Sequence, residues 1–151
     1  MNSELIRVAC AQLGVSENRN VKKHNPVIVS YFNDIGFQWI HDDETPWCSA
    51  FVNWVALQVG AERSKLLTAR SWLAVGEGVD EPSVGDVAVF WRGARCGAKG
   101  HVGFYLNDDE KYVYLLGGNQ RNSVCVAPYK KSRLLGYRRL HAVELFVSSN
   151  L

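Results

Sequence analysis

Apolar and polar positions in the first half of the chain follow the spacing of helices. Apolar residues three or four positions apart predict a helix over residues 4–13, with Ser3 as its N-cap and Gly14 as its end. A second helix is predicted from Asn25, a capping residue followed by proline, to Gly36.

The third predicted helix is the most apolar one. It begins near Pro46 or Trp47, continues through "AFVNWV" with helical spacing, and ends at Gly60. Because so much of its surface is apolar, we expect it to lie at the centre of the fold. The segment "LTARSWLAVG" predicts a short fourth helix that ends at Gly76.

Beyond Pro82 the pattern changes to the period of strands. Five short apolar segments bounded by turn residues predict strands: "GDVAVFW", "GHVGFYL", "KYVYLLGG", "SVCVAPY" and "LLGYRRL". The polar "NDDEK" predicts a hairpin turn between the second and the third. Helices followed by consecutive strands predict an α+β fold, in which N-terminal helices pack on a mostly antiparallel sheet of about five strands. We expect a single domain over residues 1–151, acting as a monomer.

Composition narrows the classes of function. Hydrophobic residues make up 47% of the chain and charged residues 21%, as in an ordinary globular protein. A net charge of +2 is too small to indicate a nucleic-acid partner. No apolar run approaches the ~18–20 residues of a membrane span. The N-terminus lacks a basic leader before an apolar core, so we expect no general secretion signal.

The four cysteines do not form a metal-binding pattern. None lies in a C-x-x-C pair, so we expect no structural zinc and favour free thiols over disulfides. Cys10 and Cys125 occupy apolar segments and are interpreted as small buried hydrophobic residues.

Two charged segments have simple interpretations. The run from His41 to Glu44 lacks the spacing of a calcium loop, and acidic residues before a helix more commonly stabilise its dipole. Arg133, Arg138 and Arg139 are interpreted as a solvated strand face rather than as a polyanion site.

The arrangement of Cys48, His101 and Asn119 indicates a catalytic site. Cys48 opens the third helix, whose N-terminus favours a thiolate. His101 begins a strand between Gly100 and Gly103, and Asn119 ends the following strand, where antiparallel pairing would place it beside His101. A lone cysteine or histidine is usually structural. The three together, in this order, favour a nucleophilic cysteine activated by an imidazole.

Five motifs carry a resemblance to a known group, from Asn25 to Arg139: "PWCSAFVNWV", "PSVGDVAVFW", "GHVGFYL", "LLGGNQ" and "LLGYRR". In this order they resemble the papain-like cysteine hydrolases of bacterial cell walls, which include the NlpC/P60 and CHAP families. The similarity is to small CHAP-like proteins of phage, prophage and toxin settings.

The resemblance implies a papain-like core and a role for each matching residue. Cys48 is the expected nucleophile, His101 the general base and acid, and Asn119 the residue that orients the imidazole. Asp86 is expected to be structural. Three residues are expected to line the substrate cleft: Trp47, Gly100 and Gly118.

The sequence differs from papain in the side chain that would stabilise the oxyanion. Papain has a glutamine shortly before its cysteine, whereas "HDDETPW" offers carboxylates that cannot donate when ionised. The backbone amide of Cys48 is one expected donor, and Thr45 and Gln38 are the side chains considered for the other.

The expected function is therefore a peptidoglycan hydrolase that cleaves an amide bond of the peptide stem or cross-link through an acyl-enzyme, without a metal or organic cofactor. The alternatives are a non-catalytic module of the same fold that binds cell wall or protein, and a cysteine hydrolase of another amide or acyl substrate. Endolysin and interbacterial toxin both stay open. We expect synthesis in the cytoplasm, delivery to the wall by phage lysis or a secretion apparatus, and, for a toxin, a dedicated inhibitor protein.

Overall fold

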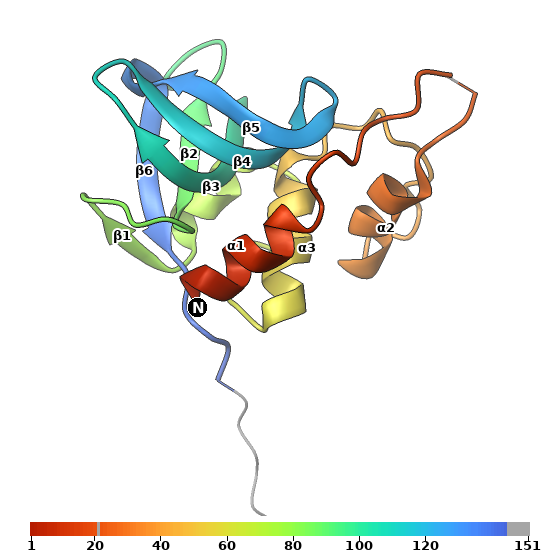
Figure 1. Cartoon of the computed structure of the whole chain (residues 1–151), viewed down its shortest axis with the longest axis horizontal. Coiled ribbons are helices and arrows are strands. Elements are labelled where there is room, and N and C mark those ends of the chain that lie inside the picture. The colour runs from red at the N-terminus through yellow and green to blue at the C-terminus, as the bar shows by residue number, and fades with distance from the viewer. Residues whose placement is uncertain (21, 145–151) are drawn as a thin grey trace, which may run out of the picture.

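The computed structural model describes residues 1–20 and 22–144, which form an antiparallel sheet with helices against one face (Figure 1). Residues 21 and 145–151 of the predicted domain lie outside this description. The helices are α1 (Asn2–Cys10), α2 (Pro26–Asp34) and α3 (Cys48–Val59), with 3₁₀ turns η1 (Ala69–Ala74) and η2 (Lys131–Arg133). The strands are β1 (Glu77–Val79), β2 (Val87–Trp91), β3 (Gly100–Asp108), β4 (Tyr112–Gln120), β5 (Ser123–Lys130) and β6 (Leu134–Arg139).

The sheet has the order β1-β6-β2-β3-β4-β5, and every neighbouring pair is antiparallel. The α+β prediction is therefore confirmed, as is the hairpin turn between β3 and β4. The five predicted strands all form, and β1 adds a sixth at the edge through pairing with β6. Three residues, "EGV", are too few to produce an alternating pattern, so no sequence pattern predicted β1.

Helix boundaries follow the predicted caps at two helices and differ at a third. Asn25 caps α2 by accepting a hydrogen bond from the Val27 amide at 2.9 Å, and Gly60 ends α3 in the left-handed conformation. In contrast, α1 begins before Ser3 and has no side-chain cap. The prediction that Ser3 caps this helix was wrong, because the chain is already helical at Asn2.

Helix α3 lies between the sheet and the other two helices, as predicted for the most apolar helix (Figure 1). Val87 and Val89 of β2 belong to the main core on the helix side, whereas Ala88 and Phe90 belong to a second apolar cluster on the opposite face. Because both faces of β2 are covered, its sequence is apolar without interruption.

Asp86, directly before β2, ties three distant segments together. Its fully buried carboxylate accepts hydrogen bonds from the Ser83 amide at 2.7 Å, Asn2 Nδ2 at 2.9 Å and Arg139 Nη2 at 2.8 Å. Burial alone would raise the pKa of Asp86, but these donors outweigh it and hold the pKa below its usual value. The structural role expected for Asp86 agrees with these contacts.

Two of the simple interpretations need correction. Arg138 and Arg139 are not a solvated strand face, because Arg138 donates to the carbonyls of Val75 and Gly76 and Arg139 pairs with Asp86. Cys10 is exposed rather than buried, because it lies at the end of α1 on the side away from the core, and Cys125 is only partly buried.

Gly118 of β4 lets the sheet approach α3 closely. A Cβ at this position would lie 2.6 Å from the Trp47 ring and 2.7 Å from the Phe51 Cβ. Any larger residue must therefore move the aromatic side chains at the start of α3, next to Cys48.

We predict that Gly118→Ala lowers the free energy of unfolding by about 1–3 kcal/mol, because the added methyl overpacks this contact. Denaturant unfolding measures the change. Gly136→Ala is the matched control, since its Cβ would meet only Leu73 Cδ2 at 3.4 Å, an ordinary contact. Equal stability of the two variants would contradict the overpacking argument.

Candidate active site

Cys48 is the first residue of α3, and only 7% of it is exposed. The backbone N–H of Val102, which directly follows His101 in β3, and the amides of Ser49 and Cys48 itself lower the pKa of the Cys48 thiol. Burial nevertheless raises the pKa of the Cys48 thiol, because desolvation outweighs these donors. The expected thiolate at the helix N-terminus is therefore disfavoured in this structure.

His101 is fully buried, and its ring is held from two directions. Its imidazole stacks on Tyr129 of β5, with ring centroids 4.4 Å apart and planes 12° from parallel. Its Nε2 lies 2.9 Å from Oε1 of Gln120. Burial lowers the pKa of His101 to about 4, so the ring is neutral at pH 7.

The Gln120 amide decides which nitrogen of His101 carries the proton. Gln120 Nε2 donates to the carbonyls of Cys125 at 2.7 Å and Leu115 at 3.2 Å, so its Oε1 faces the imidazole. An amide oxygen only accepts hydrogen bonds, so Nε2 of His101 is the protonated nitrogen. The lone pair is left on Nδ1, the nitrogen available to accept a proton.

Arg92, two residues beyond Phe90 on β2, is a site residue that the sequence analysis missed. Its Nη2 lies 3.3 Å from Nδ1 of His101, and its charge lowers the pKa values of both His101 and Cys48. The segment "VFWRG" could have predicted this position. Because β2 pairs with the start of β3, the residues at the end of β2 lie beside His101.

The residue that orients His101 is Gln120, not Asn119. The β3–β4 register, Phe104↔Leu116 and Tyr105↔Leu115, would place Asn119 opposite His101 if it continued without interruption. Instead, a bulge in β4 lies between Gly117 and Gln120 and shifts the pairing with β5 by one residue.

Backbone conformation at the β4–β5 hairpin explains the shift. Arg121 and Asn122 both have positive φ, as a two-residue hairpin turn requires, and they pair Gln120 with Ser123. Further along, Gly117 pairs with Cys125, so two residues of β4 oppose one of β5. Asn119 accommodates the extra residue by adopting a positive φ of 55°. As a result, Gln120 occupies the position predicted for Asn119.

The three predicted cleft residues do not line an open cleft. Trp47 has no exposed surface, and its indole N–H donates to Glu17 at 2.9 Å. Gly118 is covered by Trp47 and Phe51, and a Cβ on Gly100 would meet the Phe90 carbonyl at 2.6 Å. These residues provide close packing around Cys48 and His101, so the prediction of direct substrate contact is not supported.

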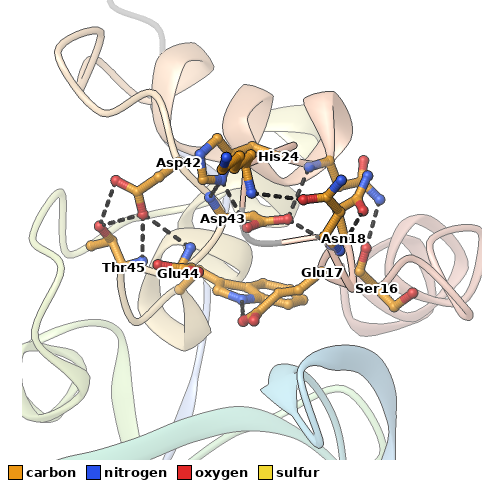
Figure 2. A network of polar contacts seen from close by, with 12 residues as sticks. Ser16, Glu17, Asn18, His24, Asp42, Asp43, Glu44 and Thr45 are labelled. Carbon is orange, nitrogen blue, oxygen red and sulfur yellow. Dashed lines mark hydrogen bonds and ion pairs between the residues drawn. The ribbon is translucent and has the colours of Figure 1, made fainter.

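The acidic run before α3 organises the preceding loops (Figure 2). Asp43 is 1% exposed and accepts hydrogen bonds from the amides of Asn18 at 2.8 Å and Asn25 at 2.9 Å, with His24 Nδ1 at 3.1 Å. Asp42 accepts from the Thr45 amide and hydroxyl. Within residues 1–20 and 22–144, no group of three or more His, Cys, Asp or Glu could hold a metal ion.

Neither side chain considered as an oxyanion donor is positioned for that role. The Thr45 hydroxyl donates to Asp42, and Gln38 lies on the exposed surface. The backbone N–H groups of Cys48 and Val102, which lower the pKa of the thiol, are the nearest candidates for donors to an oxyanion beside Cys48.

A cavity of about 260 Å³ opens beside His101. Its lining combines apolar rings with positive charges: Phe90, Trp91, Arg92, His101, Pro128, Tyr129, Lys130 and Arg133. The Arg133 guanidinium lies over the Trp91 ring, 5.0 Å from its centroid.

Comparison with known protein families matches residues 40–119, just over half of the chain, to the CHAP domain. The chain belongs to the CHAP-domain family. CHAP domains are typically cysteine- and histidine-dependent amidases or endopeptidases, and the family suggests a peptidoglycan substrate. The match includes Cys48 and His101 and ends directly before Gln120. No curated protein matches the sequence. In the described part of this CHAP domain, no helix is both long and apolar enough to cross a membrane.

Burial of His101 predicts a loss of stability in mild acid. Its folded pKa of about 4 lies below the value of 6.5 for a free imidazole, so the unfolded chain binds the proton more readily. The neutral His101 therefore contributes fully to the free energy of unfolding above pH 6.5. This contribution falls by about 3 kcal/mol as the pH drops to 4. Denaturant unfolding across this range should give a flatter slope for His101→Gln than for the unchanged CHAP domain.

The carboxylates of Asp43 and Asp86 lose their contributions to the free energy of unfolding mainly below pH 4, because their pKa values lie below the usual 3.8. Identical slopes for His101→Gln and the unchanged chain between pH 6.5 and 4 would mean that His101 is not the group being titrated.

Proposed function

We propose that this CHAP domain hydrolyses an amide bond in the peptide part of peptidoglycan, using Cys48 as the nucleophile. The observation that carries the proposal is the hydrogen bond between His101 Nε2 and Gln120, which puts the lone pair of the imidazole on Nδ1, the atom that would act as the base. Val102 follows His101 directly, and its backbone N–H lowers the pKa of the Cys48 thiol, which brings the start of β3 near the sulfur.

The proposed reaction passes through a thioester. The thiol proton moves to Nδ1 of His101 as the sulfur of Cys48 attacks the amide carbonyl carbon. The C–N bond then breaks while Nδ1 returns the proton to the leaving amine. Water, deprotonated by Nδ1, hydrolyses the thioester and releases the acid and the free thiol. The amides of Cys48 and Val102 stabilise the oxyanion in both halves.

The resting groups in this proposal are neutral. Burial raises the pKa of Cys48 and lowers that of His101, so a thiolate–imidazolium pair is disfavoured before substrate arrives. Proton transfer therefore accompanies the attack rather than preceding it. The charge of Arg92 favours a thiolate but disfavours an imidazolium, so its two effects on the ion pair oppose each other.

A second candidate function is a module that binds cell wall or protein without cutting it. The 7% exposure of Cys48 and its raised pKa are the observations that favour this alternative, because a binding module needs no accessible thiolate. A cysteine hydrolase of another amide or acyl substrate would use the same groups. Mass spectrometry of the new termini in digested wall fragments identifies the bond.

The biological settings implied by the sequence resemblance stay predictions. An endolysin and an interbacterial toxin both require delivery to the wall, by phage lysis or by a secretion apparatus. For a toxin, we propose an inhibitor protein that covers the cavity beside His101, because that cavity lies next to the imidazole.

Cys48→Ala tests the nucleophile. We expect it to abolish lysis of purified cell walls, measured as loss of turbidity, while circular dichroism stays unchanged. Cys10→Ala is the matched control, because Cys10 is exposed on α1, outside the proposed site. Undiminished lysis by Cys48→Ala would refute the mechanism, whereas wall binding without lysis by the unchanged chain would favour the binding module.

Gln120→Leu and Asn119→Gly test which residue orients the imidazole. Loss of the Gln120 oxygen should reduce kcat/KM by about 10²–10⁴-fold, the usual range for general acid–base catalysis. Asn119→Gly removes the amide but keeps the positive φ, so we expect near-normal activity.

Because Gln120 also bonds the Leu115 and Cys125 carbonyls, thermal unfolding should accompany these assays. The pH profile gives a further readout, since an imidazole that can exchange its tautomers should shift the acidic limb of Gln120→Leu. Greater loss in a folded Asn119→Gly than in Gln120→Leu would reverse the assignment.

A further inference from the structure

The cavity beside His101 has an unbalanced positive charge. Arg92, Lys130 and Arg133 contribute three cations to its lining, and none of its described lining residues is acidic. The cations come from different parts of the chain: the end of β2, the end of β5 and η2. Lys130 and Arg133 are three residues apart in the basic stretch "KKSR", and the fold brings Arg92 from another part of the chain to join them.

The same cavity holds an unused donor. Trp91 lines it, and among the described residues its indole Nε1 is buried without a hydrogen-bond partner. A buried N–H group without a partner costs about 1–3 kcal/mol, so such groups usually meet an acceptor. An acceptor bound beside Trp91 would remove this cost.

We propose that this cavity is a subsite for a carboxylate of the peptide substrate, held by Arg92, Lys130 and Arg133 next to His101. The inference rests on the proposed function, because it assigns a substrate group to the same catalytic site. Stem peptides end in carboxylates, and a carboxylate here would lie beside the imidazole that returns a proton to the leaving amine.

The dimensions and chemistry of the cavity favour a single carboxylate over a polyanion. Its volume of about 260 Å³ is below the ~300–1,000 Å³ of pockets that take drug-sized ligands, so it fits one residue rather than a length of polymer. Guanidinium groups bind carboxylates through two parallel hydrogen bonds. Tyr129 provides an apolar wall suited to a small side chain.

Arg92 connects this subsite to the reacting groups. Its Nη2 lies 3.3 Å from Nδ1 of His101. A bound carboxylate competes for that donor and draws the guanidinium towards the cavity, which frees Nδ1 to accept the thiol proton from Cys48. Substrate recognition and activation of the base are then linked through one side chain.

Binding can be tested without any catalytic readout. The probes are N-acetyl-D-alanine, its primary amide and glycerol 3-phosphate, added to the ¹⁵N-labelled full chain. The reporter is the indole N–H signal of Trp91, assigned with Trp91→Phe. We expect saturable movement with N-acetyl-D-alanine and at least tenfold weaker binding of the amide.

The double variant Lys130→Gln with Arg133→Gln should weaken N-acetyl-D-alanine binding at least tenfold, or about 1.4 kcal/mol. The matched control is Arg7→Gln with Lys23→Gln, which removes the same charge from exposed positions outside the cavity and should bind normally.

Three results would overturn the subsite: equal binding of the acid and its amide, tighter binding of glycerol 3-phosphate, or equal weakening by the control double variant. Wall lysis by the unchanged chain together with any of these refutes the subsite alone. Carboxylate binding with no lysis refutes the proposed function but leaves the anion site in place.

Discussion

The hydrogen bond between His101 Nε2 and Gln120 Oε1 is the contact on which the chemistry of the site depends. It exists because β4 contains one more residue than β5 between Gly117 and Gln120, so the bulge turns the glutamine to the imidazole. The Cys125 and Leu115 carbonyls then hold the amide in one orientation. Backbone geometry at a hairpin thus determines the tautomer of a side chain on another strand.

Packing around the first turn of α3 holds the other half of the site. Trp47 and Phe51 press against Gly118, and the Trp47 indole is anchored by Glu17. The loop before α3 is fixed by Asp43, which bonds two distant backbone amides (Figure 2). Cys48 therefore occupies a position set by three separate segments, and a change in any of them reaches the thiol.

Burial gives this site both its order and its resting state. The buried imidazole stacks on Tyr129. The same burial disfavours charge on Cys48 and His101. Arg92 supplies a cation at the boundary between these groups and the basic cavity. The thiol of Cys48 and the imidazole of His101 are consequently held in place and uncharged. A charged substrate would change the electrostatic balance that keeps these two groups neutral.

The sequence by itself determined most of the elements and the fold class, because helix caps and hydrophobic periodicity are local properties. Its motifs also identified Cys48 and His101 as the candidate catalytic pair. It also located the end of β4 as the source of the orienting amide, but placed the amide one residue early. That choice depends on a bulge, which follows from pairing between strands and leaves no local pattern at Asn119. Only the tertiary structure could decide the burial of Trp47, the direction of both pKa shifts and the convergence of Arg92, Lys130 and Arg133. These properties depend on which segments meet in space, and the spacing of residues along one segment contains no information about its neighbours.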